Sequence, residues 1–132
     1  MATWKDVHRL ARKLPETTEE RRHEHAAWLV RGRAFAWERP LRKSDLEKLG
    51  AKAPKGEILA VRVADLVVKE ACLAARAPAC FTIPHFDGYP AVLVLLAKIK
   101  VSDLEELLVE GWLARAPKTV ARRYLDAGGR DA

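Results

Sequence analysis

Residues 23–38 read HEHAAWLVRGRAFAWE and lie within a longer segment, Thr17 to Pro40, whose pattern is extended rather than helical. The segment is too long for one strand, which usually spans about 5–6 residues. Gly32 lies near its middle between two arginines, where a tight reversal of the chain is natural. We therefore expect a β-hairpin with strands over His23–Val30 and Arg33–Glu38 and a turn at Arg31-Gly32.

A helix is predicted ahead of this hairpin. Thr3 is followed three residues later by Asp6, a weak form of the capping box that begins many helices. Apolar residues then recur at helical spacing until Pro15 ends the run. The sequence therefore predicts a helix over residues 4–14.

Capping residues indicate further helices after the hairpin. The segments Ser44-Asp45-Leu46-Glu47 and Ser102-Asp103-Leu104-Glu105 are capping boxes, and Asp65 can cap another helix. Pro117 should bend the last helix before it continues. The helices predicted from these signals cover residues 45–50, 65–76 and 102–125.

The strongest short hairpin signal is Asp87-Gly88, because these residues favour a two-residue turn. It separates two strand-like segments, residues 79–86 and 89–99. Branched residues in Glu57–Val63 predict a central strand. Strands that are adjacent in sequence favour antiparallel pairing. The expected fold is α+β, an antiparallel sheet with helices packed against it, in one domain over residues 1–132.

The composition is that of a folded globular protein, with 49% hydrophobic and 32% charged residues. No apolar stretch approaches the roughly 20 residues that a membrane-spanning helix requires. The first residues also lack the charged and apolar regions of a secretory signal. We therefore expect a cytoplasmic protein that does not bind membranes.

Cys72 and Cys80 are the two cysteines of the chain. Their spacing matches no zinc or redox motif. In a reducing compartment we expect two buried thiols rather than a disulfide.

Basic residues exceed acidic ones by six, and the excess lies at the two ends of the chain. Residues 1–50 carry a net charge of +4, residues 51–110 of −1, and residues 111–132 of +3. A basic surface formed by both ends would attract polyanions such as nucleic acid. The alternative is a solvated surface that keeps the protein in solution.

Several segments resemble the MmcQ/YjbR family of small bacterial proteins. They are Leu14–Thr17, Val30–Ala36, Phe81–Val94 and Gly111–Lys118, of which the His-Phe-Asp-Gly-Tyr-Pro stretch is the most specific. The resemblance spans nearly the whole chain. It implies a YjbR-like fold, similar in layout to secretion-chaperone-like domains, and DNA binding through two projecting hairpin wings.

The leading functional hypothesis is non-catalytic binding of double-stranded DNA. Phosphates would be contacted by basic residues of the hairpin turn and of the last helix, with little sequence preference. Phe35 and Trp37, expected to share a strand face with Arg33, could extend this surface or belong to the core. The phosphate-binding candidates are Arg31, Arg33, Arg115, Lys118, Arg122 and Arg123.

The alternative hypothesis is a binding domain for a small molecule or a protein partner. His85, Asp87 and Tyr89 cluster around the second predicted turn, and a pocket is expected beside them with Trp28, Phe35 and Trp37. The same three residues also suit a purely structural turn, in which Asp87 precedes Gly88, Tyr89 packs and His85 bonds the backbone.

Catalytic and metal-binding motifs are not found in the sequence. There is no nucleophile elbow and no glycine-rich phosphate loop. His23-Glu24-His25 places two imidazoles on one face of the expected strand, but a metal site needs a further ligand. We expect no catalytic residue, no metal and no cofactor.

Overall fold

The computed structural model describes residues 1–128, and within them six strands form one antiparallel sheet in the order β1-β2-β3-β4-β6-β5. The described elements are α1 (Trp4–Arg12), β1 (Thr17–Arg22), β2 (His25–Val30), β3 (Arg33–Glu38), α2 (Lys43–Leu49), the 3-10 helix η1 (Gly50–Lys52), β4 (Ile58–Arg62), α3 (Leu66–Arg76), β5 (Cys80–Phe81), the 3-10 helix η2 (Pro84–Phe86), β6 (Ala91–Leu95), α4 (Val101–Arg115) and α5 (Lys118–Asp126). The predicted α+β class with an antiparallel sheet is confirmed.

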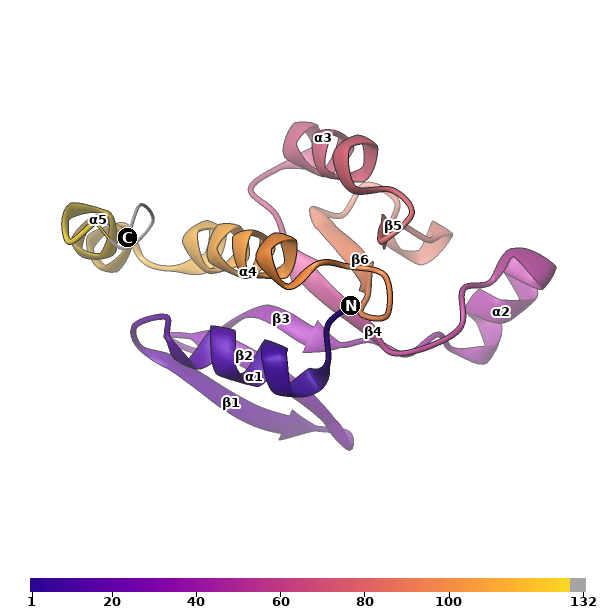
Figure 1. Ribbon diagram of the computed structural model, residues 1–132, viewed down its shortest axis with the longest axis horizontal. Coiled ribbons are helices and arrows are strands. Elements are labelled where there is room, and N and C mark those ends of the chain that lie inside the picture. Colours follow the sequence, from indigo (N-terminus) through magenta and orange to yellow (C-terminus); the bar gives the residue numbers. More distant parts are fainter. Residues whose placement is uncertain (129–132) are drawn as a thin grey trace.

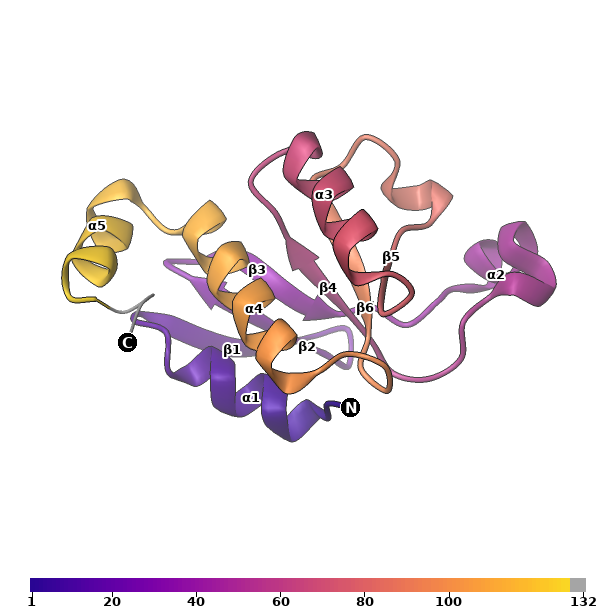
Figure 2. The ribbon, with the colours of Figure 1, turned by 45° about the horizontal axis from the view of Figure 1, so that its top comes forward.

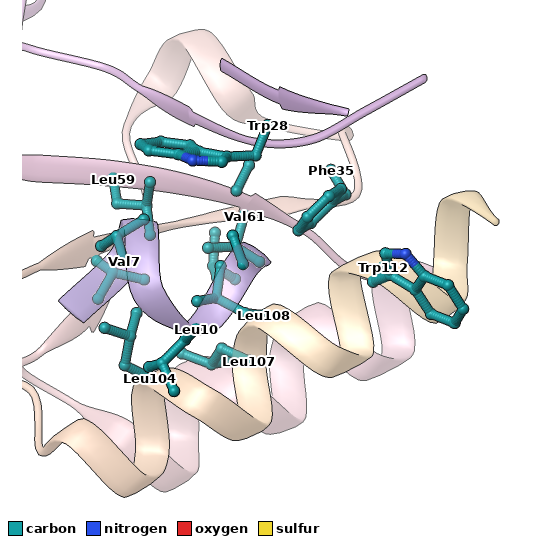
Figure 3. Packing of buried hydrophobic residues seen from close by; sticks show 14 of the residues in the cluster. Val7, Leu10, Trp28, Phe35, Leu59, Val61, Leu104, Leu107, Leu108 and Trp112 are labelled. Atoms are coloured by element: carbon teal, nitrogen blue, oxygen red, sulfur yellow. The ribbon is translucent and has the colours of Figure 1, made fainter. Parts of the chain in front are cut away.

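One face of the sheet is covered by α1, α3 and α4 (Figures 1 and 2). We call it the closed face. Trp28, Phe35 and Val61 from the strands meet Leu108 and Trp112 from α4 there, as Figure 3 shows. Most of the apolar burial lies in this layer, which fixes the position of α4 over β3 and β4.

The close approach of α4 to the sheet depends on Gly111. A Cβ atom at this position would lie 2.9 Å from Cγ1 of Val61, 3.0 Å from the carbonyl oxygen of Arg62 and 3.1 Å from that of Phe35. Such distances are well inside van der Waals contact. Glycine therefore lets the C-terminal half of α4 rest directly on the end of β4.

The N-terminal part of the sheet is a three-stranded meander rather than the predicted hairpin. The turn at Arg31-Gly32 is confirmed, since both residues have positive φ. The prediction that a strand begins at His23 was wrong, because His23 and Glu24 form a second turn with positive φ. The strand before it, β1, contains no apolar residue. Its charged side chains suit an edge strand. They also leave no alternation of apolar residues by which the strand could be recognised in the sequence.

Phe35 and Trp37 lie on opposite faces of the sheet, which corrects the expectation that they share one. Trp28 pairs with Ala36 while its neighbour Leu29 pairs with Ala34, so Phe35 is the extra residue of a β-bulge. The bulge directs Phe35 into the closed face, where it is fully buried. Trp37 packs instead on the other face, beside Phe86.

The second predicted hairpin is also different from its expectation. β5 and β6 pair antiparallel, but residues 82–90 connect them as a loop that contains η2, not as a two-residue turn at Asp87-Gly88. Asp87 has φ −59° and ψ 130°, and Gly88 has φ 75°, which is a type II turn inside this loop. The wing implied by the family resemblance is thus absent at this place in the described chain.

Helix starts were predicted within two residues. The N-caps at Thr3 and Asp65 are confirmed, because their side chains accept hydrogen bonds from the backbone of Asp6 and Val68. The two Ser-led capping boxes were wrong in detail. α2 begins at Lys43 and α4 at Val101, so Ser44 and Ser102 lie inside the first turns.

Pro117 separates α4 from α5, as predicted. Cys72 and Cys80 are free and buried, which confirms the expected thiols. Within residues 1–128, no helix has the length and apolar character needed to cross a membrane.

Candidate functional site

The face of the sheet opposite the closed face carries a cleft of about 610 Å³ over β2, β3 and the end of β4. Its floor includes Ala27 and Ala34, whose small side chains leave space above the strands. Trp37 borders the floor, and Phe86 and Tyr89 from the 82–90 loop form part of its wall. Its size lies in the range of small-molecule sites, about 300–1,000 Å³. We call it the open-face cleft.

The wall of the cleft is held by a buried lysine of α3. Nζ of Lys69 donates hydrogen bonds to the carbonyl oxygen of Phe86, at 2.6 Å, and to that of Tyr89, at 2.9 Å. Burial lowers the pKa of Lys69, and the charge of Asp87 offsets part of this effect. A buried ammonium that bonds two carbonyl groups holds the 82–90 loop to α3.

At one end of the cleft, two arginines lie together without carboxylate partners. Nη1 of Arg62 donates to the Tyr89 hydroxyl at 3.1 Å, and its guanidinium lies 5.1 Å from the centre of the Tyr89 ring. The Nε atoms of Arg62 and Arg115 are buried, and neither has a hydrogen-bond partner within residues 1–128. Both guanidiniums line this end of the cleft, and their positive charge suits an anionic acceptor from a ligand.

Arg115 also experiences a third positive charge. Burial lowers the pKa of Arg115 most, followed by the positive charges of Arg62 and Arg33. Because arginine stays protonated in proteins, the three guanidiniums repel one another and favour an anion between or beside them.

The other end of the cleft is closed by a buried ion pair. Arg39 donates to Asp45 at 3.0 Å, and both side chains are 5% exposed. Burial alone would raise the pKa of Asp45, but hydrogen bonds from the Arg42 backbone and from Arg39, together with the charges of Arg39 and His85, lower it overall. Asp45 therefore neutralises the charge of Arg39.

Glu38 is a carboxylate that lines the same cleft. Its Oε1 accepts a hydrogen bond from the backbone of Ala26 at 2.9 Å, and its Oε2 lies 3.8 Å from Nδ1 of His25. The side chain is 23% exposed and keeps acceptor capacity toward the cleft.

The hairpin turn and the C-terminal region, predicted separately as basic sites, lie at the same end of the molecule. Arg31 forms an ion pair with Glu16, whose pKa is lowered mainly by that bond and further by the charges of Arg31 and Arg123. In the same region, the positive charge of Arg33 lowers the pKa of Arg115. We call these predicted residues the basic edge: Arg31, Arg33, Arg115, Lys118, Arg122 and Arg123.

The helix α5 carries half of the basic edge. Lys118, Arg122 and Arg123 are exposed on it. Figures 1 and 2 place α5 at one end of the molecule and α2 at the opposite end. The basic edge is therefore remote from the lysines of α2 and η1.

The residues of the alternative hypothesis are divided between cleft and core. His85 and Tyr89 line the cleft, as does Trp37. Asp87 is exposed in the loop, and its negative charge raises the pKa of Lys69 against the effect of burial. Trp28 and Phe35 are buried in the closed face and do not line the cleft.

Sequence reasoning missed Arg62 and Lys69. Alternation along β4 provides a signal for Arg62, because it follows Ile58 and Ala60 on one face of the strand. Lys69 has no such signal, since its partners are backbone carbonyls 17 and 20 residues away. Its role depends on how α3 packs against the 82–90 loop.

A comparison with solved structures finds the same fold in the crystal structure of Deinococcus radiodurans protein DR2400, described as a DUF419 domain. The TM-score is 0.61 and the identity 19%, over 86% of this chain and 78% of that one. No protein-family model matches the chain.

Curated relatives from mycobacteria are much more similar in sequence. The uncharacterized proteins Rv2570 of Mycobacterium tuberculosis and Mb2600 of Mycobacterium bovis are each 52% identical to it over 132 residues, covering 98% of this chain and 100% of each relative. At this identity and coverage, the chain belongs to one family with these mycobacterial proteins.

Proposed function

We propose that this protein binds DNA non-catalytically, through phosphate contacts made by the basic edge. The observation that carries the proposal is that the β2–β3 turn and the C-terminal helices bring their arginines together: Arg33 lies near Arg115, and Glu16 lies near both Arg31 and Arg123. Guanidinium groups held together in this way favour binding of phosphate oxygens, which they can bond in a bidentate manner.

The MmcQ/YjbR assignment belongs to the same proposal. The shared fold with a DUF419 domain and the Val30–Ala36 and Phe81–Val94 segments support it. The β2–β3 turn supplies one projecting hairpin for DNA. The 82–90 loop folds back on the sheet, so α5 takes the place of the second wing in our proposal.

Binding to the backbone predicts weak sequence preference and strong salt dependence. Phosphate contacts release counterions, so the logarithm of affinity falls linearly with the logarithm of salt concentration. Lys118 and Arg122 are exposed on one helix, and neither they nor Arg33 resembles a set of side chains placed to read base edges.

The test is fluorescence anisotropy of a labelled duplex titrated with wild-type protein at several salt concentrations. We expect a Kd of about 10⁻⁴–10⁻⁶ M near physiological salt. The double variant Arg33→Glu with Arg122→Glu should weaken binding at least about tenfold and reduce the magnitude of the log–log salt slope by about 2.

The matched control is Lys48→Glu with Lys52→Glu, which changes net charge equally at the α2 end of the molecule. The proposal requires this variant to bind nearly as well as the wild type. Equal losses in both double variants would mean that only net charge matters. Unchanged binding in the basic-edge variant would also contradict the proposal.

A further inference from the structure

The open-face cleft has the features of a small-molecule site, and of the basic edge it includes only Arg115. Its floor is made by small residues of the central strands, Ala27 and Ala34, with the half-buried Trp37 beside them. A side chain of ordinary size at either alanine would fill this space. The cleft therefore persists because two adjacent strands each carry an alanine in its floor.

The Arg62 end of the cleft has donors without acceptors. The guanidiniums of Arg62 and Arg115 both line it, and neither forms an ion pair within residues 1–128. The Tyr89 hydroxyl, already bonded to Arg62, adds a further polar group. Two guanidiniums match the charge of a phosphate monoester dianion and offer more donors than one carboxylate accepts.

The remainder of the cleft offers aromatic surface. The rings of Trp37 and Phe86 have centroids 6.5 Å apart and are tilted by 49°. Arg39 lies over the Phe86 ring at 5.5 Å, and its own charge is neutralised by the ion pair with Asp45. A planar apolar group of a ligand can pack against these rings. Glu38 provides an acceptor for an N–H group of the same ligand.

We propose that the open-face cleft binds a small phosphate monoester that carries a planar ring, of the size of a mononucleotide. Its phosphate is held by Arg62, Arg115 and the Tyr89 hydroxyl. Its ring lies along Trp37 and Phe86. Lys69 keeps the wall in place by fixing the backbone of the 82–90 loop.

The chain provides a local spectroscopic probe for this site. Among its four tryptophans, Trp37 lines the cleft, whereas Trp28 and Trp112 have their indole N–H groups bonded to Glu19 and to Pro15. Trp4 stacks on Trp28, away from the cleft. The indole signal of Trp37 in a ¹⁵N-labelled sample, assigned with Trp37→Phe, therefore reports occupancy.

The experiment titrates the full chain with adenosine monophosphate, adenosine or inorganic phosphate, and follows the indole signals by NMR. Adenosine monophosphate should shift the Trp37 signal and leave the other three indoles nearly unchanged. Adenosine and inorganic phosphate should each bind at least about tenfold more weakly, because each lacks one half of the recognised group. Equal binding of adenosine and its monophosphate, or no shift of Trp37, would overturn the proposal.

Variants separate this site from DNA binding. Arg62→Gln and Arg115→Gln should each weaken adenosine monophosphate at least about tenfold, whereas Arg9→Gln on α1 should not. Arg122→Glu, expected to weaken DNA binding, should leave adenosine monophosphate binding unchanged. Wild-type affinity in both Arg62→Gln and Arg115→Gln would overturn the proposal, and thermal unfolding of each variant verifies that it is folded.

Discussion

The two faces of the sheet are built from the same strands but differ in character. On the closed face, Phe35 of β3 and Leu108 and Trp112 of α4 are completely or almost completely buried. The open face instead combines small side chains with charged groups. Arg39 pairs with Asp45, whereas Arg62 and Arg115 form no ion pair within residues 1–128. The closed face therefore supplies stability, while the open face keeps polar groups that binding can satisfy.

The largest expected effect is the loss of stability when the packing of the closed face is disrupted. Trp112 is fully buried, packs on Tyr124 with ring centroids 5.0 Å apart, and donates its indole N–H to the carbonyl oxygen of Pro15 at 3.0 Å. Trp112→Ala should lower the free energy of unfolding by about 5 kcal/mol, the upper end for such truncations. Urea unfolding followed by circular dichroism measures it.

Trp112→Phe is the matched comparison, since it keeps most of the volume and removes the hydrogen bond. A loss under about 2 kcal/mol is expected for it. If Trp112→Ala lost no more than Trp112→Phe, the closed face would not be the source of stability described above.

An intermediate loss of stability is expected when the buried ion pair between Arg39 and Asp45 is broken. Asp45→Asn leaves the buried Arg39 without its counter-charge, and should cost about 3 kcal/mol at neutral pH. Asp6→Asn is the control, because Asp6 is at a helix start on the surface and pairs with the exposed Arg9. Its loss should be clearly smaller.

The same pair predicts a pH dependence. The pKa of Asp45 is lowered in the folded protein, so its contribution is present above the unfolded pKa of about 3.9 and is lost as pH falls through the lower folded value. The difference in stability between wild type and Asp45→Asn should therefore shrink below about pH 4. A difference that stays constant down to pH 2 would mean that the carboxylate charge is not what stabilises the pair.

The closed face was the more predictable of the two. Apolar periodicity and capping residues such as Thr3 and Asp65 are local signals, and they located α1 and α3 within two residues. The turn at Gly32 is equally local, because it needs a residue that tolerates positive φ. These elements then determine most of the closed-face core.

The open face depends on contacts between distant residues, which sequence patterns do not contain. The bulge that separates Phe35 from Trp37 arises from the register between β2 and β3. Arg62 and Arg115 lie near each other only because α4 lies on β4, which Gly111 permits. The sequence indicated that Arg115 is a basic residue just before the Pro117 bend, but it did not indicate that Arg115 lines a cleft.

The smallest expected effect is a gain in stability rather than a loss. Arg115→Gln removes a partly buried charge that lies near Arg62 and Arg33 without a carboxylate partner in the described residues. Stability should rise by about 0.5–1 kcal/mol, because repulsion and desolvation are relieved while most of the packing remains. Thermal unfolding at low salt measures this gain.

Salt sharpens the comparison, since added ions screen the repulsion of partly exposed charges. The gain in Arg115→Gln should shrink as salt is raised, whereas Arg9→Gln, which removes a paired surface arginine, should show no gain at any salt concentration. A stabilised Arg115→Gln variant that also loses ligand binding would show that the open face retains repulsion because binding requires it. A destabilised variant would instead give Arg115 a structural role, and the division of labour between the two faces would fail at this residue.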